Sequence, residues 1–468
     1  MIERGQVNIK NPAVGVGLGA FFYLALAVFP RQSVQGWSEP QFGFLKGRPA
    51  TLHKIEKSWR PIGGPEANSI TITAEIDPLT KLQGLFRFTL YDVSRGRGWC
   101  MNSGFGEDPD FRFVGNQPDF LPLRNEDGRF VLEGTKQVRL ASIVVQAFDS
   151  GAFGRLKAEV NIDGIWSEVP ADDGKSYITL PLDENENHIA DFWEERWGVL
   201  GQKAVDDRDP EPGGLEDGDG FSNFEEYRGF VMKGRWSDTW PGLKDVFVVD
   251  DVGRGVGHFT KLGVAVHFLD RTEVSSLADR VVNFNGGNAS AGIQKAIYIC
   301  PAHLPETVFG KVEPGIGTPN VVERVLIDAG KLQRSSPDKV AWALAHLLGH
   351  AVNITHHGDF PGVSECDKDI GAVGQPGQAH AGEANCVMRY VFAFPYYDPG
   401  DGTCYPYPIE DTFGTDYCSS RAGTGLNGGP SRADGAGNPL PMAGAGSRGP
   451  CRSSLAVKGS HANGGSNK

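Results

Sequence analysis

Residues 335–357, "SSPDKVAWALAHLLGHAVNITHH", place the tightest limits on how this chain can fold. Ser336 suits a helix N-cap, and Pro337 suits the first helical position, where its missing N–H costs nothing. The predicted helix carries His346 and His350 four residues apart. That spacing puts both imidazoles on one face of the helix, where they can bind the same metal ion.

The residues after this helix predict an abrupt turn. Asn353 follows the second histidine, and Asn tolerates the left-handed conformation that ends helices better than any residue except Gly. His356 then comes six residues after His350, at the distance of a third ligand. Met388, in the short segment "CVMRY", lies 32 residues beyond His356.

These residues resemble the H-E-x-x-H-x-x-G-x-x-H motif and methionine turn of the metzincins, a family of secreted zinc peptidases. The resemblance covers residues 335–392. It implies an α+β zincin domain over residues 242–420, a zinc ion bound by three histidines, and a methionine beneath the metal. The implied residues are His346, His350 and His356 as ligands and Met388 in the turn.

The sequence departs from this motif at its general base. The family has Glu directly after the first histidine, where it takes a proton from the zinc-bound water and passes it to the leaving amine. Here that position is Leu347, which accepts no proton. Loss of a positioned base costs a factor of about 10² to 10⁴ in rate. Other carboxylates close in sequence are candidate substitutes: Asp359, Glu365 and Glu383.

The first 29 residues are typical of a secretory signal peptide, with an uncleaved membrane anchor as the alternative. Two cations precede an uncharged stretch over residues 13–29, and "ALA" at 25–27 resembles a cleavage site. We therefore expect a secreted or cell-surface protein, in which disulfides are permitted. The candidate pairs are Cys366 with Cys386 and Cys404 with Cys418, while Cys100, Cys300 and Cys451 have no assigned partner.

The rest of the chain divides by its sequence pattern. Alternating runs such as "SITITAEI" and "LFRFTLYDV" predict an antiparallel β-sandwich, of immunoglobulin-like type, over residues 66–168. Short β-type runs precede the histidine helix in the zincin domain. Segments 30–65 and 423–468 are predicted to be a linker and a disordered tail, because Gly, Ser, Pro and Asn bury little core.

Between these domains, residues 180–230 contain two acidic cassettes with calcium-loop spacing. The first, "DENENHIADFWE", offers oxygens at positions one, three, five, nine and twelve, which converge on one ion. His188 stands at position six, where such loops have Gly. The expected ligands are Asp183, Asn185, Asn187, Asp191 and Glu194.

The second cassette, "LEDGDGFSNFEE", has Leu215 at position one, and residues 206–209 are candidates to lend the missing oxygens. The pair resembles the thrombospondin type 3-like calcium repeats of secreted bacterial proteins. The alternative is an acidic linker without metal. The expected ligands here are Asp217, Asp219, Asn223 and Glu226.

The net charge of −13 argues against nucleic acid as a partner, because phosphate contacts need clustered cations. Three functions stay open. The first is a zinc endopeptidase that acts on extracellular protein or peptide with an unusual base. The second is a catalytically weak or dead homologue that binds zinc and calcium. The third is a structural protein whose histidines only pack.

Overall fold

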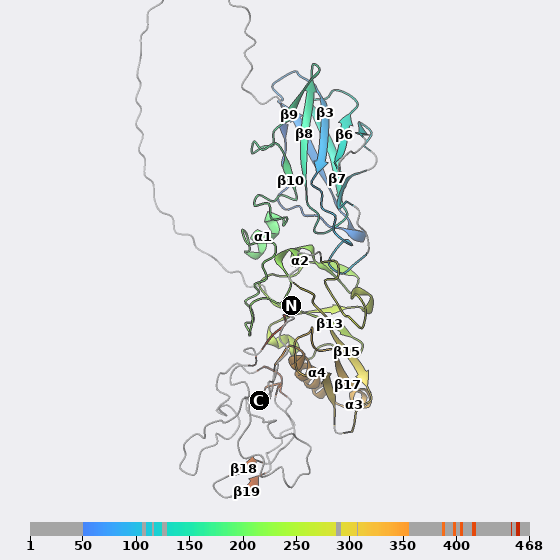
Figure 1. Cartoon of the computed structure of the whole chain (residues 1–468), viewed down its shortest axis with the longest axis vertical. Helices are drawn as coiled ribbons and strands as arrows, with labels where there is room; N and C mark the ends of the chain where they lie inside the picture. Colours follow the sequence, from blue (N-terminus) through green and yellow to red (C-terminus); the bar gives the residue numbers. More distant parts are fainter. Residues whose placement is uncertain are drawn as a thin grey trace, which may run out of the picture. The chain divides into compact units, whose positions relative to one another are not determined.

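The computed structural model describes residues 50–104, 109–114, 117–123, 129–286, 292–306, 308–354, 386–388, 396–398, 403–405, 414–417, 451 and 455–458. Over these ranges the protein is mostly β-sheet with few helices (Figure 1). The N-terminal apolar segment, His356, Cys366, Cys418 and the three candidate substitute carboxylates lie outside them.

The first domain consists of two antiparallel sheets, as the alternating sequence pattern predicts. Residues from both sheets, such as Ile72, Phe88 and Leu156, form one buried hydrophobic cluster. One sheet has the order β1 (Ala50–Leu52), β2 (Ser69–Ile76), β7 (Leu140–Ala147) and β4 (Phe111–Phe113). The other has the order β10 (Ile178–Leu180), β8 (Gly154–Ile162), β3 (Leu85–Tyr91), β6 (Phe130–Gly134) and β5 (Phe120–Leu123), with β9 (Ile165–Val169) paired to β8.

The sandwich extends beyond the predicted boundaries at both ends. Strand β1 lies within the segment predicted as a linker, and β10 lies past residue 168. Each of these strands has three residues and pairs with a longer neighbour in its sheet. Three residues are too few to show an alternating pattern, so only the pairing reveals these strands.

The acidic segment forms two loops, each followed by a short helix. Helix α1 (Asp191–Trp197) begins within the first cassette, and helix α2 (Asn223–Arg228) begins within the second. The hairpin β11 (Phe230–Met232) and β12 (Arg235–Ser237) follows α2. We call residues 183–237 the acidic module.

The C-terminal domain is built on a five-stranded sheet in which only one edge strand is antiparallel. Four of its strands occupy the β-type runs expected from the sequence. The order is β14 (Ala265–Leu269), β13 (Asp245–Asp250), β15 (Ile297–Ala302), β17 (Arg324–Asp328) and β16 (Gly310–Glu313), with β16 antiparallel to β17. The C-terminal domain also contains the short helical segments η2 (Phe259–Leu262), η3 (Arg271–Glu273) and α3 (Ala329–Arg334). The first domain contains one such segment among its described residues, η1 (Gly64–Glu66). Strand β18 (Tyr396–Asp398) pairs with β19 (Thr403–Tyr405).

Strand β13 is buried on both faces of this sheet. Val246 and Val248 belong to the core that includes α4 (Pro337–Ala351), the predicted histidine helix. Phe247 and Val249, one residue out of phase, pack in a second core with Phe221 of the acidic module. The run "VFVV" is continuously apolar for this reason, since both of its faces are covered.

Residues 455–458, which fall in the segment predicted as a disordered tail, also join this domain. Leu455 is fully buried, and Val457 is 4% exposed. The main-chain N–H of Ala456 donates to the carbonyl of Val352 at 3.0 Å, directly after α4. The low-complexity sequence around this short apolar segment hides its contribution to the core.

A buried ion pair joins the acidic module to the sandwich. Arg228, at the end of α2, contacts Asp149 through Nε at 3.0 Å and Nη2 at 2.5 Å. Its remaining N–H groups donate to the carbonyls of Asn285 and Arg97. Only 4% of the Arg228 side chain and 2% of the Asp149 side chain are exposed. Removing one partner of such a pair leaves an uncompensated charge in the interior.

We therefore expect Arg228→Met to lower the free energy of unfolding by about 3–5 kcal/mol, as measured by urea denaturation. Combining it with Asp149→Asn should recover most of that loss, because no buried charge is then left alone. The control is Lys136→Met, whose ion pair with Asp119 is more than half exposed on both sides, and which should change stability by less than about 1 kcal/mol. Equal losses in the Arg228 and Lys136 variants would contradict this account.

Candidate functional site

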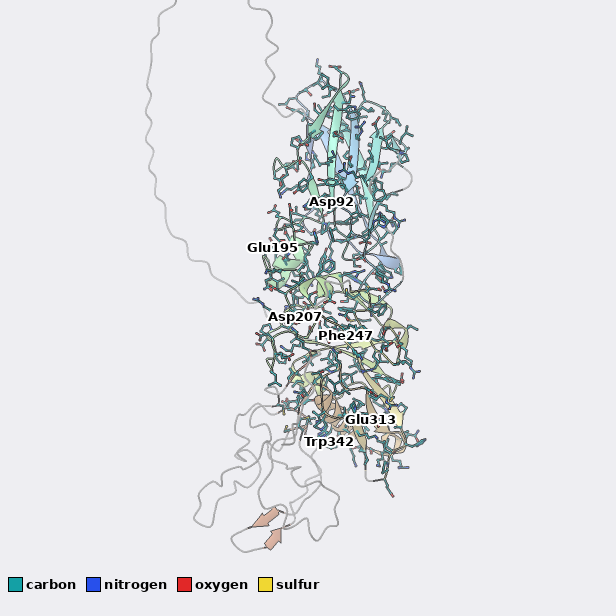
Figure 2. The ribbon with its side chains drawn as sticks, in the orientation of Figure 1. Asp92, Glu195, Asp207, Phe247, Glu313 and Trp342 are labelled. Carbon is teal, nitrogen blue, oxygen red and sulfur yellow. The ribbon has the colours of Figure 1, made fainter. Side chains whose placement is uncertain are left out.

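Helix α4 brings the ring nitrogens of His346 and His350 together. Ser336 caps the helix by accepting the N–H of Lys339, and Pro337 is its first residue, as predicted. The two Nε2 atoms lie 3.2 Å apart. Both residues are buried, at 5% and 6% exposure. Trp342, one turn earlier on the same helix, is labelled in Figure 2.

Hydrogen bonds at the other ring nitrogen fix the tautomer of both histidines. His346 donates Nδ1–H to the carbonyl of Val387 at 2.9 Å, and His350 donates Nδ1–H to the carbonyl of Ile354 at 2.8 Å. Each neutral ring therefore presents the lone pair of Nε2 to the other. Burial lowers the pKa of both imidazoles, that of His350 to about 3, with His346 as the second cause. Two facing lone pairs on neutral rings fit a shared cation.

The backbone around the helix end supports this geometry. Asn353 has φ 69°, the left-handed conformation predicted for it, and its N–H donates to the Gly317 carbonyl at 2.9 Å. The turn places the Ile354 carbonyl against His350. The third expected ligand, His356, follows two residues beyond the described part of this turn.

Met388 lies directly against α4 at Gly349, the residue before His350. A Cβ added to Gly349 would stand 2.5 Å from the Met388 Sδ, so only Gly permits this approach. The adjacent carbonyl of Val387 accepts hydrogen bonds from both Trp342 Nε1 and His346 Nδ1. The segment 386–388 thus orients a candidate ligand and closes the core under it.

Leu347 points away from solvent, toward the antiparallel edge strand β16. It is 6% exposed and belongs to the core that packs α4 on the sheet. A Cβ on Gly310, the first residue of β16, would lie 2.5 Å from the Leu347 Cδ1. The position where the metzincin motif has a carboxylate is therefore filled here by a packed apolar side chain.

The first acidic loop is closed by hydrogen bonds between its own residues. The Asp183 carboxylate accepts the main-chain N–H groups of Asn187 at 3.2 Å and His188 at 2.7 Å. His188, at position six, has φ 74°, the conformation for which such loops use Gly. The ring of His188 stacks on Phe153 at a centroid distance of 3.6 Å. The stacking with Phe153 offsets part of the conformational free energy that a non-glycine residue loses in the left-handed conformation at position six.

Glu194 completes this loop from α1. Its two carboxylate oxygens accept the side-chain amides of Asn185 at 3.0 Å and Asn187 at 2.7 Å, so three of the expected ligands converge. The fourth, Asp191, accepts the N–H of Glu184. Burial raises the pKa of Glu194 to about 7, and the nearby charges of Asp183 and Asp191 contribute to the rise.

In the second loop, the structure gathers a different set of carboxylates from the expected one. Asp219 and Glu226 are buried as expected, but Asp217 is exposed. Asp207 and Asp209 join Asp219 instead, with one oxygen of each within 4.8 Å of the others (Figure 2 labels Asp207). The acidic run before the cassette was the one sequence signal for these two residues. Asn223 is also buried, and its amide donates to the Lys203 carbonyl.

Among the described cysteines, Cys386 and Cys451 lie closest together, with their Sγ atoms 3.5 Å apart and both side chains buried. The expected partner of Cys386 lies outside the described residues, so that pairing stays a prediction. Cys100 is buried and contacts Ser103, and burial raises the pKa of Cys300.

The chain has no match among protein-family models or among curated proteins. Solved structures similar to parts of it include the reeler domain of human F-spondin, with 14% identity over 28% of this chain and 86% of that one, at a TM-score of 0.20. The Reelin-N domain of F-spondin has 15% identity over 29% and 87%, at 0.19. A DUF4466 family protein from Parabacteroides merdae has 10% identity over 25% and 42%, at 0.16. These scores are too low to support an argument about function.

No helix within the described ranges is long and apolar enough to cross a membrane.

Proposed function

We propose that this chain is a secreted or cell-surface homologue of the metzincin zinc peptidases that holds zinc and has weak or no peptidase activity. The observation that carries the proposal is the pair of Nε2 atoms 3.2 Å apart, each on a ring whose Nδ1–H is held by a main-chain carbonyl. Metal-binding histidines are held in this way, because a hydrogen bond at one nitrogen directs the lone pair of the other toward the ion.

His346 and His350 fit zinc in both donor type and orientation, and His356 is the proposed third ligand. Zinc bound there would supply a Lewis acid that polarises a carbonyl and lowers the pKa of water. The chain's own contribution is to hold the two rings neutral and oriented, through Val387 and Ile354.

Leu347 supports the part of the proposal that concerns activity. Its side chain packs between α4 and β16, so it neither accepts a proton nor leaves space for another group at that position. An extracellular protein or peptide is the proposed partner. The runner-up is an active endopeptidase that uses another carboxylate as its base, and the test of Leu347 below separates the two.

The first acidic loop is proposed to bind calcium, and the sandwich to act as an immunoglobulin-like spacer. The side chains of Asp183, Asn185, Asn187 and Glu194 converge, with both asparagine amides donating to Glu194, and this gathering of oxygen-bearing groups supports calcium, which takes six to eight oxygen ligands. Calcium there would stiffen the connection between the two domains and take no part in peptide hydrolysis.

We expect one zinc ion per chain in the purified protein, and its loss in His350→Ala, as measured by elemental analysis after dialysis. The control is His53→Ala, because His53 is a partly exposed residue of the sandwich whose removal leaves the metal site intact. Zinc absent from the wild-type protein, after incubation with excess zinc, would leave the histidines a packing role only.

We expect zinc-loaded Leu347→Glu to hydrolyse a mixed peptide library at a rate about 10² to 10⁴ times that of the wild type. Leu347→Gln is the matched control, since it has the same shape and polarity without a basic oxygen, and it should stay at the wild-type level. Circular dichroism checks that both variants fold. A wild-type rate equal to that of the Glu variant would overturn the weak-activity proposal and favour the runner-up.

Calcium should raise the melting temperature above its value in chelator, and Glu194→Gln should reduce that rise, because it removes the bidentate ligand. Glu195→Gln is the control: this neighbour is 43% exposed and pairs with Lys57 on the surface. A rise of equal size in the Glu194 variant and in the wild type would contradict calcium binding at the first loop.

A further inference from the structure

The second acidic loop repeats the hydrogen bonds of the first around a longer connection. The Asp207 carboxylate accepts the N–H groups of Asp219 and Gly220 at 2.9 and 3.0 Å. In the first loop, the Asp183 carboxylate accepts the N–H groups four and five residues after it. The second loop therefore has the same first position, followed by an insertion of eight residues. This insertion hides the position from a search for fixed spacing.

From that point onward the two loops coincide residue by residue. Gly220 has φ 96° where the first loop has His188 with φ 74°. Asp219 accepts the N–H two residues later at 2.9 Å, as Asn187 does in the first loop. In both loops the helix begins two residues after that N–H, and a glutamate lies three residues further along. Glu226 therefore holds the position of the bidentate ligand.

Asp209 is the independent sign of a ligand. The residue is 1% exposed, and neither of its carboxylate oxygens has a hydrogen-bond partner among the residues that the structure describes. One of these oxygens lies within 4.8 Å of ligand oxygens from Asp207 and Asp219. Burying a charged carboxylate without hydrogen bonds has a large free-energy cost compared with leaving it in water, unless an ion compensates the charge.

The described cations near the cluster leave it short of positive charge. Lys458 pairs with Asp207 at 2.6 Å. Lys244 donates to the main-chain carbonyl of Asp209, and its positive charge partly offsets the rise that burial and the neighbouring carboxylates cause in the pKa of Asp209. Burial raises the pKa of Glu226, and the charges of Asp209, Asp219 and Asp245 raise it further.

We propose that Asp207, Asp209, Asp219 and Glu226 bind a second divalent cation, of the calcium class, in a loop interrupted by the inserted residues 210–217. All four ligands offer oxygen, which suits calcium or magnesium and not zinc or copper. A glutamate that can bind through both oxygens favours calcium, since magnesium requires near-ideal octahedral geometry. The site is independent of the histidines on α4.

The ion would join the acidic module to the C-terminal domain. Asp245, the first residue of β13, donates its N–H to the Asp219 carboxylate at 2.6 Å. The inserted residue Leu215 donates its N–H to the Leu455 carbonyl at 2.9 Å, and Lys458 reaches Asp207 from the same segment. Residues 455–458 therefore connect this loop to the end of α4.

Calcium titration of the full chain, after removal of metal with chelator, tests the site. Calorimetry should find two calcium ions for the wild type and one for Asp209→Asn. Asp217→Asn is the matched control, because it removes a carboxylate from the same cassette but from an exposed position, and it should still bind two. One ion in the Asp217 variant and two in the Asp209 variant would overturn the proposal.

Thermal melting separates a ligand from a structural residue. In chelator, Asp209→Asn should melt at or above the wild-type temperature, because it removes one of several repelling buried charges. In saturating calcium it should melt below the wild type. A lower melting temperature in both conditions would overturn the proposal, since that pattern belongs to a residue that only packs. Glu226→Gln provides a second variant with the same expected loss of one ion and the same crossover.

Discussion

The C-terminal domain depends on strand β13 being covered on both faces. One face packs on α4, which carries the histidine pair, and the other packs on Phe221 from the second acidic loop. An apolar strand with both faces buried cannot be stable unless two other elements supply those faces. The acidic module is therefore part of the core of this domain as well as a connection to the sandwich, where Arg228 and Asp149 form the matching contact.

This arrangement explains why so many carboxylates are buried. Asp219 and Phe221 are two residues apart, so the side chain that completes the β13 core brings the acidic loop into the interior with it. Carboxylates in that place are costly on their own and become stabilising when they share an ion. Covering β13 with Phe221 therefore has an electrostatic consequence, because it buries acidic residues of the loop whose charge must be compensated.

The local features of the sequence predict the local structure well. The alternation in "SITITAEI" predicts strand β2, and the Ser336–Pro337 start and the left-handed Asn353 are found as expected. Prediction fails where a contact joins residues distant in sequence. The sequence does name residues 206–209 as candidates for the second loop, but fixed spacing gives Asp207 no position there and takes the exposed Asp217 as a ligand. Residues 455–458 are missed because four residues carry no periodicity that a pattern could detect.

In helix α4, the two histidines and Leu347 differ in what their burial contributes. The carbonyls of Val387 and Ile354 orient two buried rings toward each other, an arrangement that fits the proposed metal site. Leu347 contributes to packing instead. Burying a leucine side chain stabilises the fold by about 1.5–3 kcal/mol, and a carboxylate at that position would lose this stabilisation. The orientation of the two rings and the packing of Leu347 therefore support the proposal of a homologue that holds zinc and has weak or no peptidase activity.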